Sequence, residues 1–264
     1  MPHPMLTMAV RAARAAGNVI SRATDHVQDL TIEVKRRNDF VSEVDHQAEH
    51  AIIDILKRAY PDHHFLGEES GDTGNENSDY RWIIDPLDGT TNFLHGLPHY
   101  AVSIALEHQG RIELGVVYNP TNQELFTAER GGGAYLNNRR IRVAGLRNLE
   151  SALLGTGFPF RPEQDVQQYL KTFLALHGPL AGIRRAGSAA LDLAYVASGR
   201  LDGYWEFGLR PWDIAAGVLL VREAGGIVID SDGTENYLTS GNLIAANPKV
   251  THAMLKAIGT ALKS

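Results

Sequence analysis

Two aspartates that follow a short apolar run are the residues whose type and spacing could do chemistry. The run Trp82–Ile84 predicts the end of a buried strand, and Pro86 is expected to stop that strand. Asp85 and Asp88 stand three residues apart across this break. Carboxylate oxygens are the ligands that a hard cation such as Mg²⁺ prefers. The pattern therefore predicts a cation site in the turn after the strand.

The residues directly behind the aspartates could bind an anion. Gly89, Thr90 and Thr91 offer backbone N–H groups and hydroxyls to a phosphate. A plain alternative is a turn in which Asp85 and Asp88 bond only local N–H groups. We favour the metal interpretation, because two acids, two hydroxyls and a glycine within seven residues exceed what a turn requires. The hypothesis is a cation and a phosphate held side by side.

A magnesium site needs further oxygen ligands, because Mg²⁺ demands a near-octahedral arrangement. Glu68 follows the short apolar segment 63–66, and Asp213 opens a predicted helix over 212–224. An acid at the start of a helix is usually a cap, and on its own Asp213 is best interpreted in that way. Both acids become metal ligands only if the fold brings them to Asp85 and Asp88.

Composition and charge exclude several classes of function. The chain has 264 residues, 44 % hydrophobic and 21 % charged, which is typical of a globular protein with a sizeable core. A net charge of −6 argues against nucleic acid as the main ligand. The absence of cysteine excludes disulfides and thiolate chemistry. No signal peptide and no apolar run of about 20 residues is visible, so we expect a cytoplasmic protein without a membrane partner.

The elements that must position the site change character along the chain. An alanine-rich helix over 5–21 and a second helix from Ser42 to Pro61 come first. Ser42 and Asp45 predict a capping box, which explains Asp45 without a functional role; whether it also faces the metal stays open. Residues 71–79 predict a surface loop. An antiparallel meander is then expected from strands at 101–107, 111–118 and 124–128.

The second part of the chain alternates strands and helices. We expect strands at 152–156, 182–184, 201–206, 226–229 and 243–246, and helices at 163–177, 188–198, 212–224 and 248–263. The sequence thus predicts a layered α/β (α+β) fold in one compact unit. We expect residues 1–143 to form helices and an antiparallel sheet that carries most metal ligands, and residues 144–264 to form an α/β half.

Three motifs in this order resemble the inositol monophosphatase family. They are Gly-Glu-Glu-Ser at 67–70, Asp-Pro-Leu-Asp-Gly-Thr-Thr-Asn-Phe at 85–93, and Trp-Asp-Ile-Ala-Ala-Gly at 212–217. The resemblance extends from the first helix to the last. The stretches 187–194 and 206–213 look most like the bacterial SuhB-type members. The resemblance implies the αβαβα sandwich of the Mg²⁺-dependent, lithium-sensitive sugar phosphatases.

The resemblance also implies roles for individual residues. Two or three Mg²⁺ ions are implied per site, with Asp85 bridging them. The implied metal ligands are Glu68, Asp85, the backbone carbonyl of Leu87, Asp88 and Asp213. The implied catalytic residues are Glu68, Thr90 and Asp88, and Glu68 and Thr90 would position the attacking water. The implied substrate contacts are Leu87, Asp88, Gly89, Thr90, Gly187, Ser188, Ala189, Glu206 and Asp213. Because Leu87 would act through its carbonyl, its side chain is expected to be replaceable.

The activity implied is hydrolysis of a small phosphate monoester, inositol monophosphate, to myo-inositol and phosphate. Attack would come in line from a water that Mg²⁺ activates, without a phosphoenzyme. Inhibition by lithium and a homodimer are implied as well. Related phosphatases of the same superfamily act on fructose 1,6-bisphosphate or on 3′-phosphoadenosine nucleotides, and these substrates stay open.

Two other classes of function compete with this interpretation. Asp88-Gly89-Thr90 superficially resembles the Asp-x-Asp nucleophile motif of haloacid dehalogenase phosphatases, but Asp85 and Asp88 are separated by two residues rather than one. SuhB-type proteins also act in transcription antitermination and ribosomal RNA synthesis, so a transcription-machinery partner is a further alternative. Arginines at 139, 140, 142, 184 and 185 could form such a surface; we favour ordinary solvated or dimer-contact positions.

Overall fold

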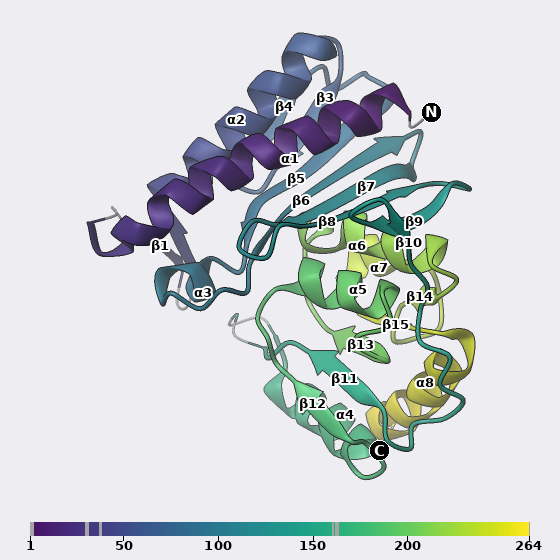
Figure 1. Ribbon diagram of the computed structural model, residues 1–264. Helices are drawn as coiled ribbons and strands as arrows, with labels where there is room; N and C mark the ends of the chain where they lie inside the picture. Colours follow the sequence, from purple (N-terminus) through teal and green to yellow (C-terminus); the bar gives the residue numbers. More distant parts are fainter. Residues whose placement is uncertain (1–2, 30–31, 37–38, 160, 162–163, 264) are drawn as a thin grey trace.

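The computed structural model describes residues 3–29, 32–36, 39–159, 161 and 164–263. Helices and sheets alternate in five layers (Figure 1). One face of an eight-stranded sheet is covered by α1 (Pro4–Ala23) and α2 (Glu43–Ala59). Between this sheet and a five-stranded sheet lie α5 (Ala189–Ala197) and α6 (Pro211–Glu223). The outer layer is α4 (Val166–His177) and α8 (Pro248–Lys263). The expected αβαβα sandwich is confirmed.

The larger sheet has the strand order β10-β9-β8-β7-β6-β5-β3-β4. Its strands are β3 (His64–Gly67), β4 (Gly71–Gly74), β5 (Tyr80–Asp88), β6 (Ala101–His108), β7 (Arg111–Asn119), β8 (Glu124–Glu129), β9 (Gly133–Leu136) and β10 (Arg139–Arg140). From β5 to β10 each strand pairs antiparallel with the next, which confirms the meander. The expected loop over 71–79 is wrong at its start, because β4 pairs with β3 there. A short hairpin of β1 (Ile32–Arg36) and β2 (Asp39–Ser42) precedes α2.

The smaller sheet has the order β12-β11-β13-β15-β14. Its strands are β11 (Leu153–Thr156), β12 (Gly182–Arg184), β13 (Gly203–Glu206), β14 (Ile227–Ile229) and β15 (Leu243–Ala246). Strand β11 runs parallel to its two neighbours, and β15 runs antiparallel to β13 and β14. The strands and helices expected in this half are all present with small shifts at their ends. Residue 163, where the first of these helices was expected to begin, lies outside the described residues. The sequence did not predict the short helix α7 (Tyr237–Ser240).

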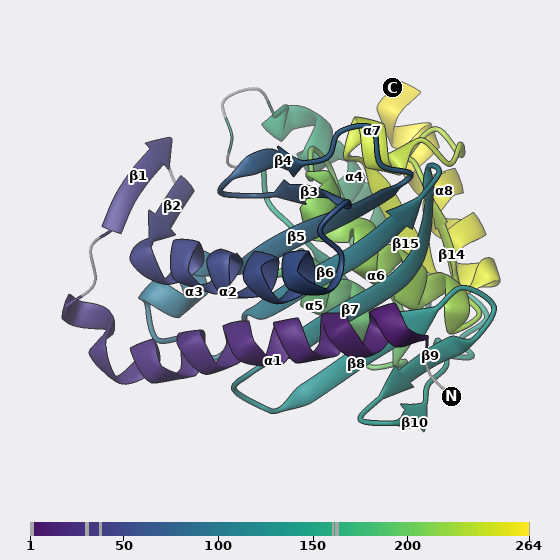
Figure 2. The same cartoon turned by 90° about the horizontal axis from the view of Figure 1, so that it is seen from above.

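Strand β5 aims the acidic residues because its side chains alternate between two cores. Trp82 and Ile84 pack with α1 and α2, whereas Ile83 packs with α5 and α6. Alternation then directs Asp85 toward the layer of α5 and α6, where the core gives way to polar groups. Seen from above, β5 runs between α2 and α6 (Figure 2).

Two expectations about the residues after Asp85 are wrong. Pro86 does not stop the strand: β5 continues to Asp88, and its pairing with β6 shifts register between Asp85 and Asp88. A bulge at that point accommodates Pro86, which has no N–H to contribute to the ladder. Leu87 is also more than a carbonyl, because its side chain is 1 % exposed within the core under α1 and α2.

The two halves share a core rather than standing apart. Every strand of the larger sheet lies before residue 143 and every strand of the smaller sheet lies after it. Helices α5 and α6 nevertheless pack on the larger sheet, in one cluster that contains Ile83, Leu193 and Ile214. The expected division near residue 143 thus describes the sheets, and the expectation that both halves fold as one compact unit stays a prediction.

Candidate active site

A cavity of about 310 Å³ lies where the ends of β5 and β13 approach the N-termini of α3 (Thr90–Leu94), α5 and α6. Its lining residues are Glu68, Asp88, Gly89, Thr90, Thr91, Thr156, Gly157, Arg185, Gly187, Ser188, Ala189, Asp192, Tyr204, Glu206, Leu209 and Asp213. Nine of the eleven sequence-predicted site residues are among them. The other two, Asp85 and Leu87, are buried immediately beside the lining, each 1 % exposed.

Asp88 joins the two halves of the molecule at this cavity. Its Oδ2 accepts hydrogen bonds from Ser188 Oγ at 2.7 Å and from the N–H of Ala190 at 2.7 Å. Ser188 is the N-cap residue of α5, so the carboxylate sits where the helix offers unpaired N–H groups. Burial nevertheless raises the pKa of Asp88 to about 7, and the hydrogen bond from Ser188 works against that shift.

Asp85 is the most strongly perturbed acid of the cluster. Its Oδ1 accepts a hydrogen bond from the N–H of Leu87 at 2.9 Å. Burial raises the pKa of Asp85 well above its usual range, and the charges of Glu68, Asp88 and Asp213 add to the rise. Glu68 is brought to β5 by its own N–H, which donates to the carbonyl of Ile84 at 3.0 Å.

Asp213 both caps α6 and lines the cavity. Its Oδ2 accepts from the N–H of Arg210 at 2.7 Å, which is the capping contact at the start of α6. The same residue lines the cavity, and burial raises its pKa to about 7, with the charge of Asp88 contributing. A helix cap and a cavity-facing acid are therefore the same side chain here.

The acids fit a hard cation by their chemistry. Within the described part of the chain, no three Asp, Glu or His side chains stand in a ready-made chelate. In each of Asp85, Asp88 and Asp213, one carboxyl oxygen instead accepts a hydrogen bond from the protein. Burial and like charges raise the pKa values of these three carboxyls, and Arg185 is the one basic residue among the described lining residues. A cation bound beside them would reverse the rise.

Thr90 is held by a residue whose role the sequence left open. Its Oγ1 lies 2.9 Å from Asp45 Oδ1 and 3.0 Å from the carbonyl oxygen of Leu87. Asp45 also completes the predicted capping box, because its Oδ2 accepts from the N–H of Ser42 at 2.8 Å. The capping box was visible in the sequence, but only the packing of α2 beside β5 shows that Asp45 contacts Thr90, which lines the cavity.

The opposite wall of the cavity is built by β13. Glu206 ends that strand, and its Oε2 accepts a hydrogen bond from the hydroxyl of Tyr204. Burial raises the pKa of Glu206 to about 7. Gly157 stands against it, and a Cβ at Gly157 would overlap the Glu206 carboxyl group. Only glycine therefore leaves the carboxyl its place in the wall.

The sequence did not identify two further lining residues, Arg185 and Asp192, as site residues. Arg185, interpreted above as a surface position, lines the cavity, and its guanidinium carbon lies 5.6 Å from the centre of the Phe158 ring. Asp192 lines it as well and is 2 % exposed. The one signal for both was their place beside or within the stretch 187–194.

Asn92 ties the segment before Gly187 to α3. Its Nδ2 donates to the carbonyl of His99 at 2.7 Å and to the carbonyl of Ala186 at 2.9 Å. Gly187 has a φ of 93°, and a Cβ there would lie 2.8 Å from Arg185 Nη1. The left-handed backbone favours glycine, whereas the crowding could be relieved by a shift of the Arg185 guanidinium.

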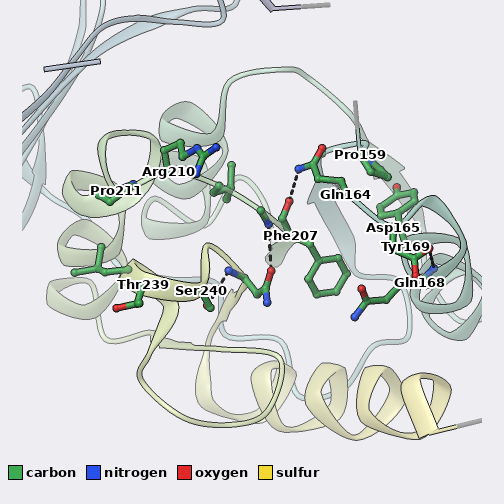
Figure 3. Close-up of a pocket in the computed structure, with 15 residues that line it drawn as sticks. Pro159, Gln164, Asp165, Gln168, Tyr169, Phe207, Arg210, Pro211, Thr239 and Ser240 are labelled. Carbon is green, nitrogen blue, oxygen red and sulfur yellow. Dashed lines mark hydrogen bonds between the residues drawn. The ribbon is translucent and has the colours of Figure 1, made fainter. Parts of the chain in front are cut away.

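A second cavity of about 390 Å³ adjoins the first and shares Gly157 and Leu209 with it. Figure 3 shows Gln164 pointing toward Phe207, where its Nε2 donates to the backbone carbonyl at 2.8 Å. None of the sequence-predicted site residues lines this second cavity.

The described helices include none that is long and apolar enough to cross a membrane.

Residues 1–262 match the sequence model of the inositol monophosphatase family. Nus factor SuhB of Pseudomonas aeruginosa is 54 % identical over 259 residues, which are 97 % of this chain and 96 % of that protein. Extragenic suppressor protein suhB of Bartonella henselae has a structure that is 48 % identical, with a TM-score of 0.94 over 97 % of this chain and 98 % of that one. For inositol monophosphatase of Anabaena the identity is 39 % and the TM-score 0.85, over 97 % and 95 % of the two chains.

Proposed function

The chain belongs to the inositol monophosphatase family, and from this premise we propose that it hydrolyses inositol monophosphate to myo-inositol and phosphate with Mg²⁺ as cofactor. One observation carries the proposal. Buried carboxyls with raised pKa values lie in or directly beside the lining of a cavity at which the N-termini of three helices also lie. Acids for a cation and N–H groups for an anion are what a metal-dependent phosphatase needs side by side.

The cation would be held by the side of the cavity formed by Glu68, Asp85, Asp88 and Asp213, which we call the acidic wall. We assign Glu68, Asp85, Asp88, Asp213 and the carbonyl of Leu87 as its ligands, with Asp85 at the centre because every other acid of the set acts on it or adjoins it. When bound, Mg²⁺ supplies a water of lowered pKa and neutralises charge on the phosphate and the leaving oxygen. The number of ions, two or three in the proposal, follows from the family resemblance.

The phosphate would lie at the start of α3. Gly89 is the N-cap of this helix with a φ of 99°, and a Cβ there would lie 2.9 Å from the carbonyl oxygen of His99. Glycine is therefore required, and the N–H groups that follow it are free to donate to phosphate oxygens. Thr90 and Thr91 add hydroxyls at the same edge of the cavity.

The attacking water would be oriented by Thr90. Because the hydroxyl hydrogen of Thr90 is directed to Asp45 or to the carbonyl of Leu87, its oxygen is left as an acceptor for the proton of a water. Glu68 also lines the cavity and would serve as a second acceptor. Gly187, Ser188, Ala189 and Glu206 would contact the hydroxyls of the alcohol that leaves.

Phosphate release from myo-inositol 1-phosphate, with and without Mg²⁺, tests the proposal, with fructose 1,6-bisphosphate and a 3′-phosphoadenosine nucleotide as competitors. We expect Mg²⁺-dependent release that favours the inositol ester and is inhibited by lithium. Asp88→Asn should abolish it, whereas Asp202→Asn should not, because Asp202 accepts a hydrogen bond from Leu153 outside the cavity. Release without Mg²⁺, or a phosphoenzyme trapped on Asp85 or Asp88, would refute the mechanism.

We further propose a role with the transcription machinery, because the similar protein of Pseudomonas aeruginosa is called a Nus factor. The exposed Arg139 and Arg140 on β10 are candidates for such a contact. The test is complementation of a bacterium that lacks its own relative. Growth restored by Asp88→Asn but not by a variant with both arginines replaced by glutamate would support a binding role separate from hydrolysis. Growth that requires Asp88 would tie the phenotype to the enzyme.

A homodimer is also proposed, on the family resemblance. Light scattering coupled to size exclusion tests it directly. A mass near twice the 28.9 kDa of one chain is expected, and a single-chain mass would refute it.

A further inference from the structure

The position of Asp192 in its helix is not explained by contacts within the described part of the protein. Helix α5 has the sequence Ala-Ala-Leu-Asp-Leu-Ala-Tyr-Val-Ala, in which Asp192 is the one charged residue. Most of its neighbours in the helix are buried apolar residues, and Asp192 itself is 2 % exposed. Burying a carboxyl group is costly unless hydrogen bonds compensate it.

No donor in the described part of the chain compensates that cost. The nearby hydroxyls are directed elsewhere: Tyr204 donates to Glu206, and Ser188 donates to Asp88. Only burial and surrounding charges act on the Asp192 carboxyl, and burial raises its pKa well above the usual range. Buried polar groups in native proteins are almost always hydrogen-bonded, so a partner for this carboxyl is to be sought in the cavity that it lines.

The surroundings of Asp192 define what that partner is. Gly155 of β11 stands behind it, where a Cβ would lie 3.5 Å from Asp192 Cγ. Gly155 pairs with Tyr204 of the neighbouring strand, and Glu206 follows on the same face two residues later. Asp192 and Glu206 therefore present two carboxyl groups on one wall. When ionised, these two carboxyls accept hydrogen bonds from hydroxyls and repel a second phosphate.

Resting on the proposed function, we propose that Asp192 is a specificity-determining residue that accepts a hydrogen bond from a hydroxyl of the leaving alcohol. Together with Glu206 it selects a neutral polyol as the leaving group over one that carries another phosphate. The hydroxyl supplies the hydrogen-bond donor that the described part of the protein lacks, and it reaches Asp192 from the cavity that both carboxyls line.

The experiment compares two esters of different leaving groups in the presence of Mg²⁺. Myo-inositol 1-phosphate offers hydroxyls to the wall, and p-nitrophenyl phosphate offers none. For Asp192→Asn we expect kcat/KM to fall about 10- to 100-fold for the inositol ester, the range for a lost hydrogen bond to a charged group. For p-nitrophenyl phosphate we expect a change within about twofold. Asp230→Asn is the matched control, since Asp230 is 4 % exposed and outside the cavity lining.

A second readout needs no turnover. In EDTA, myo-inositol is expected to raise the Tm of the wild type and of Asp230→Asn, and to raise that of Asp192→Asn much less. Equal losses on both esters, or an undiminished Tm shift in Asp192→Asn, would overturn the proposal. If the wild type hydrolyses neither ester, the proposed function fails, and the Tm shift alone then decides the role of Asp192. A wild type that shows neither a shift nor a preference between the esters overturns it too.

Discussion

The two walls of the cavity are built in opposite ways. The acidic wall comes mainly from one stretch of chain, in which Asp85 and Asp88 leave a single strand and Gly89 turns directly into α3. The leaving-group wall comes from separate elements, with Gly187 and Asp192 at the start of α5 and Glu206 at the end of β13. The acidic wall is specified by local sequence, and the leaving-group wall is specified by the packing of separate elements. The comparison indicates that the reaction is encoded locally, whereas selectivity depends on how the two sheets are stacked.

If the acidic wall carries the reaction, its loss must affect every substrate alike. We expect Asp85→Asn to lower kcat by about 10³-fold for the inositol ester and for p-nitrophenyl phosphate, because it removes the central ligand and several kcal/mol of charge stabilisation. Steady-state kinetics on both esters measures this. A loss confined to the inositol ester would contradict the division between the walls.

Thr90 is not one of the proposed metal ligands, so its replacement tests the orientation of the attacking water separately from cation binding. We expect Thr90→Val to lower kcat by about 10²-fold on both esters, because the acceptor that orients the water is lost. Thr90→Ser keeps the hydroxyl that reaches Asp45 and should retain most activity. Equal rates for the valine and serine variants would remove Thr90 from the mechanism.

The leaving-group wall should respond to the substrate instead. For Glu206→Gln we expect kcat/KM to fall about 10-fold on the inositol ester, with p-nitrophenyl phosphate nearly unaffected, since a charged hydrogen-bond acceptor is lost. The ratio of the two kcat/KM values is the measurement. If both esters lose rate equally, Glu206 belongs functionally to the acidic wall.

The pH dependence of stability follows from the raised pKa values. Burial raises the pKa values of Asp88, Asp213 and Glu206 to about 7 in the folded protein. The folded state therefore binds more protons than the unfolded state between about pH 4 and pH 7, so metal-free stability should fall as pH rises through this window. Tm measured in EDTA should show the fall, and saturating Mg²⁺ should flatten it. A Tm in EDTA that rises with pH would show that the acids are not destabilised by burial.

The smallest effect is expected at Leu87. Leu87→Met should leave kcat within about twofold and cost less than about 1.5 kcal/mol of unfolding free energy, because the carbonyl and the buried volume are both kept. Leu87→Ala should cost about 2 to 5 kcal/mol by leaving a cavity in the core under α1 and α2. Chemical denaturation distinguishes the two. An unchanged stability for the alanine variant would contradict the packing of this side chain.

What the sequence could predict follows the same division. The meander, the helices and the position of Asp85 and Asp88 depend on local alternation and turn chemistry, which are visible residue by residue. The course of β5 through Pro86 was not predictable, because the bulge depends on pairing with β6. Asp192 and Arg185 could not be identified as cavity residues for a related reason. Asp192 is brought there by the packing of α5 between the two sheets, and Arg185 by its place directly after β12.

The most direct test of the central claim, that the buried acids form a cation site, is calorimetric titration of the metal-free protein with Mg²⁺ near neutral pH. Repeating it in buffers of different ionisation enthalpy counts the protons released. Binding must ionise carboxyls whose pKa values burial raises, to about 7 for Asp88 and Asp213. We therefore predict a net release of protons that disappears with the binding in Asp85→Asn. Absence of Mg²⁺ binding, or binding without proton release, would contradict the account.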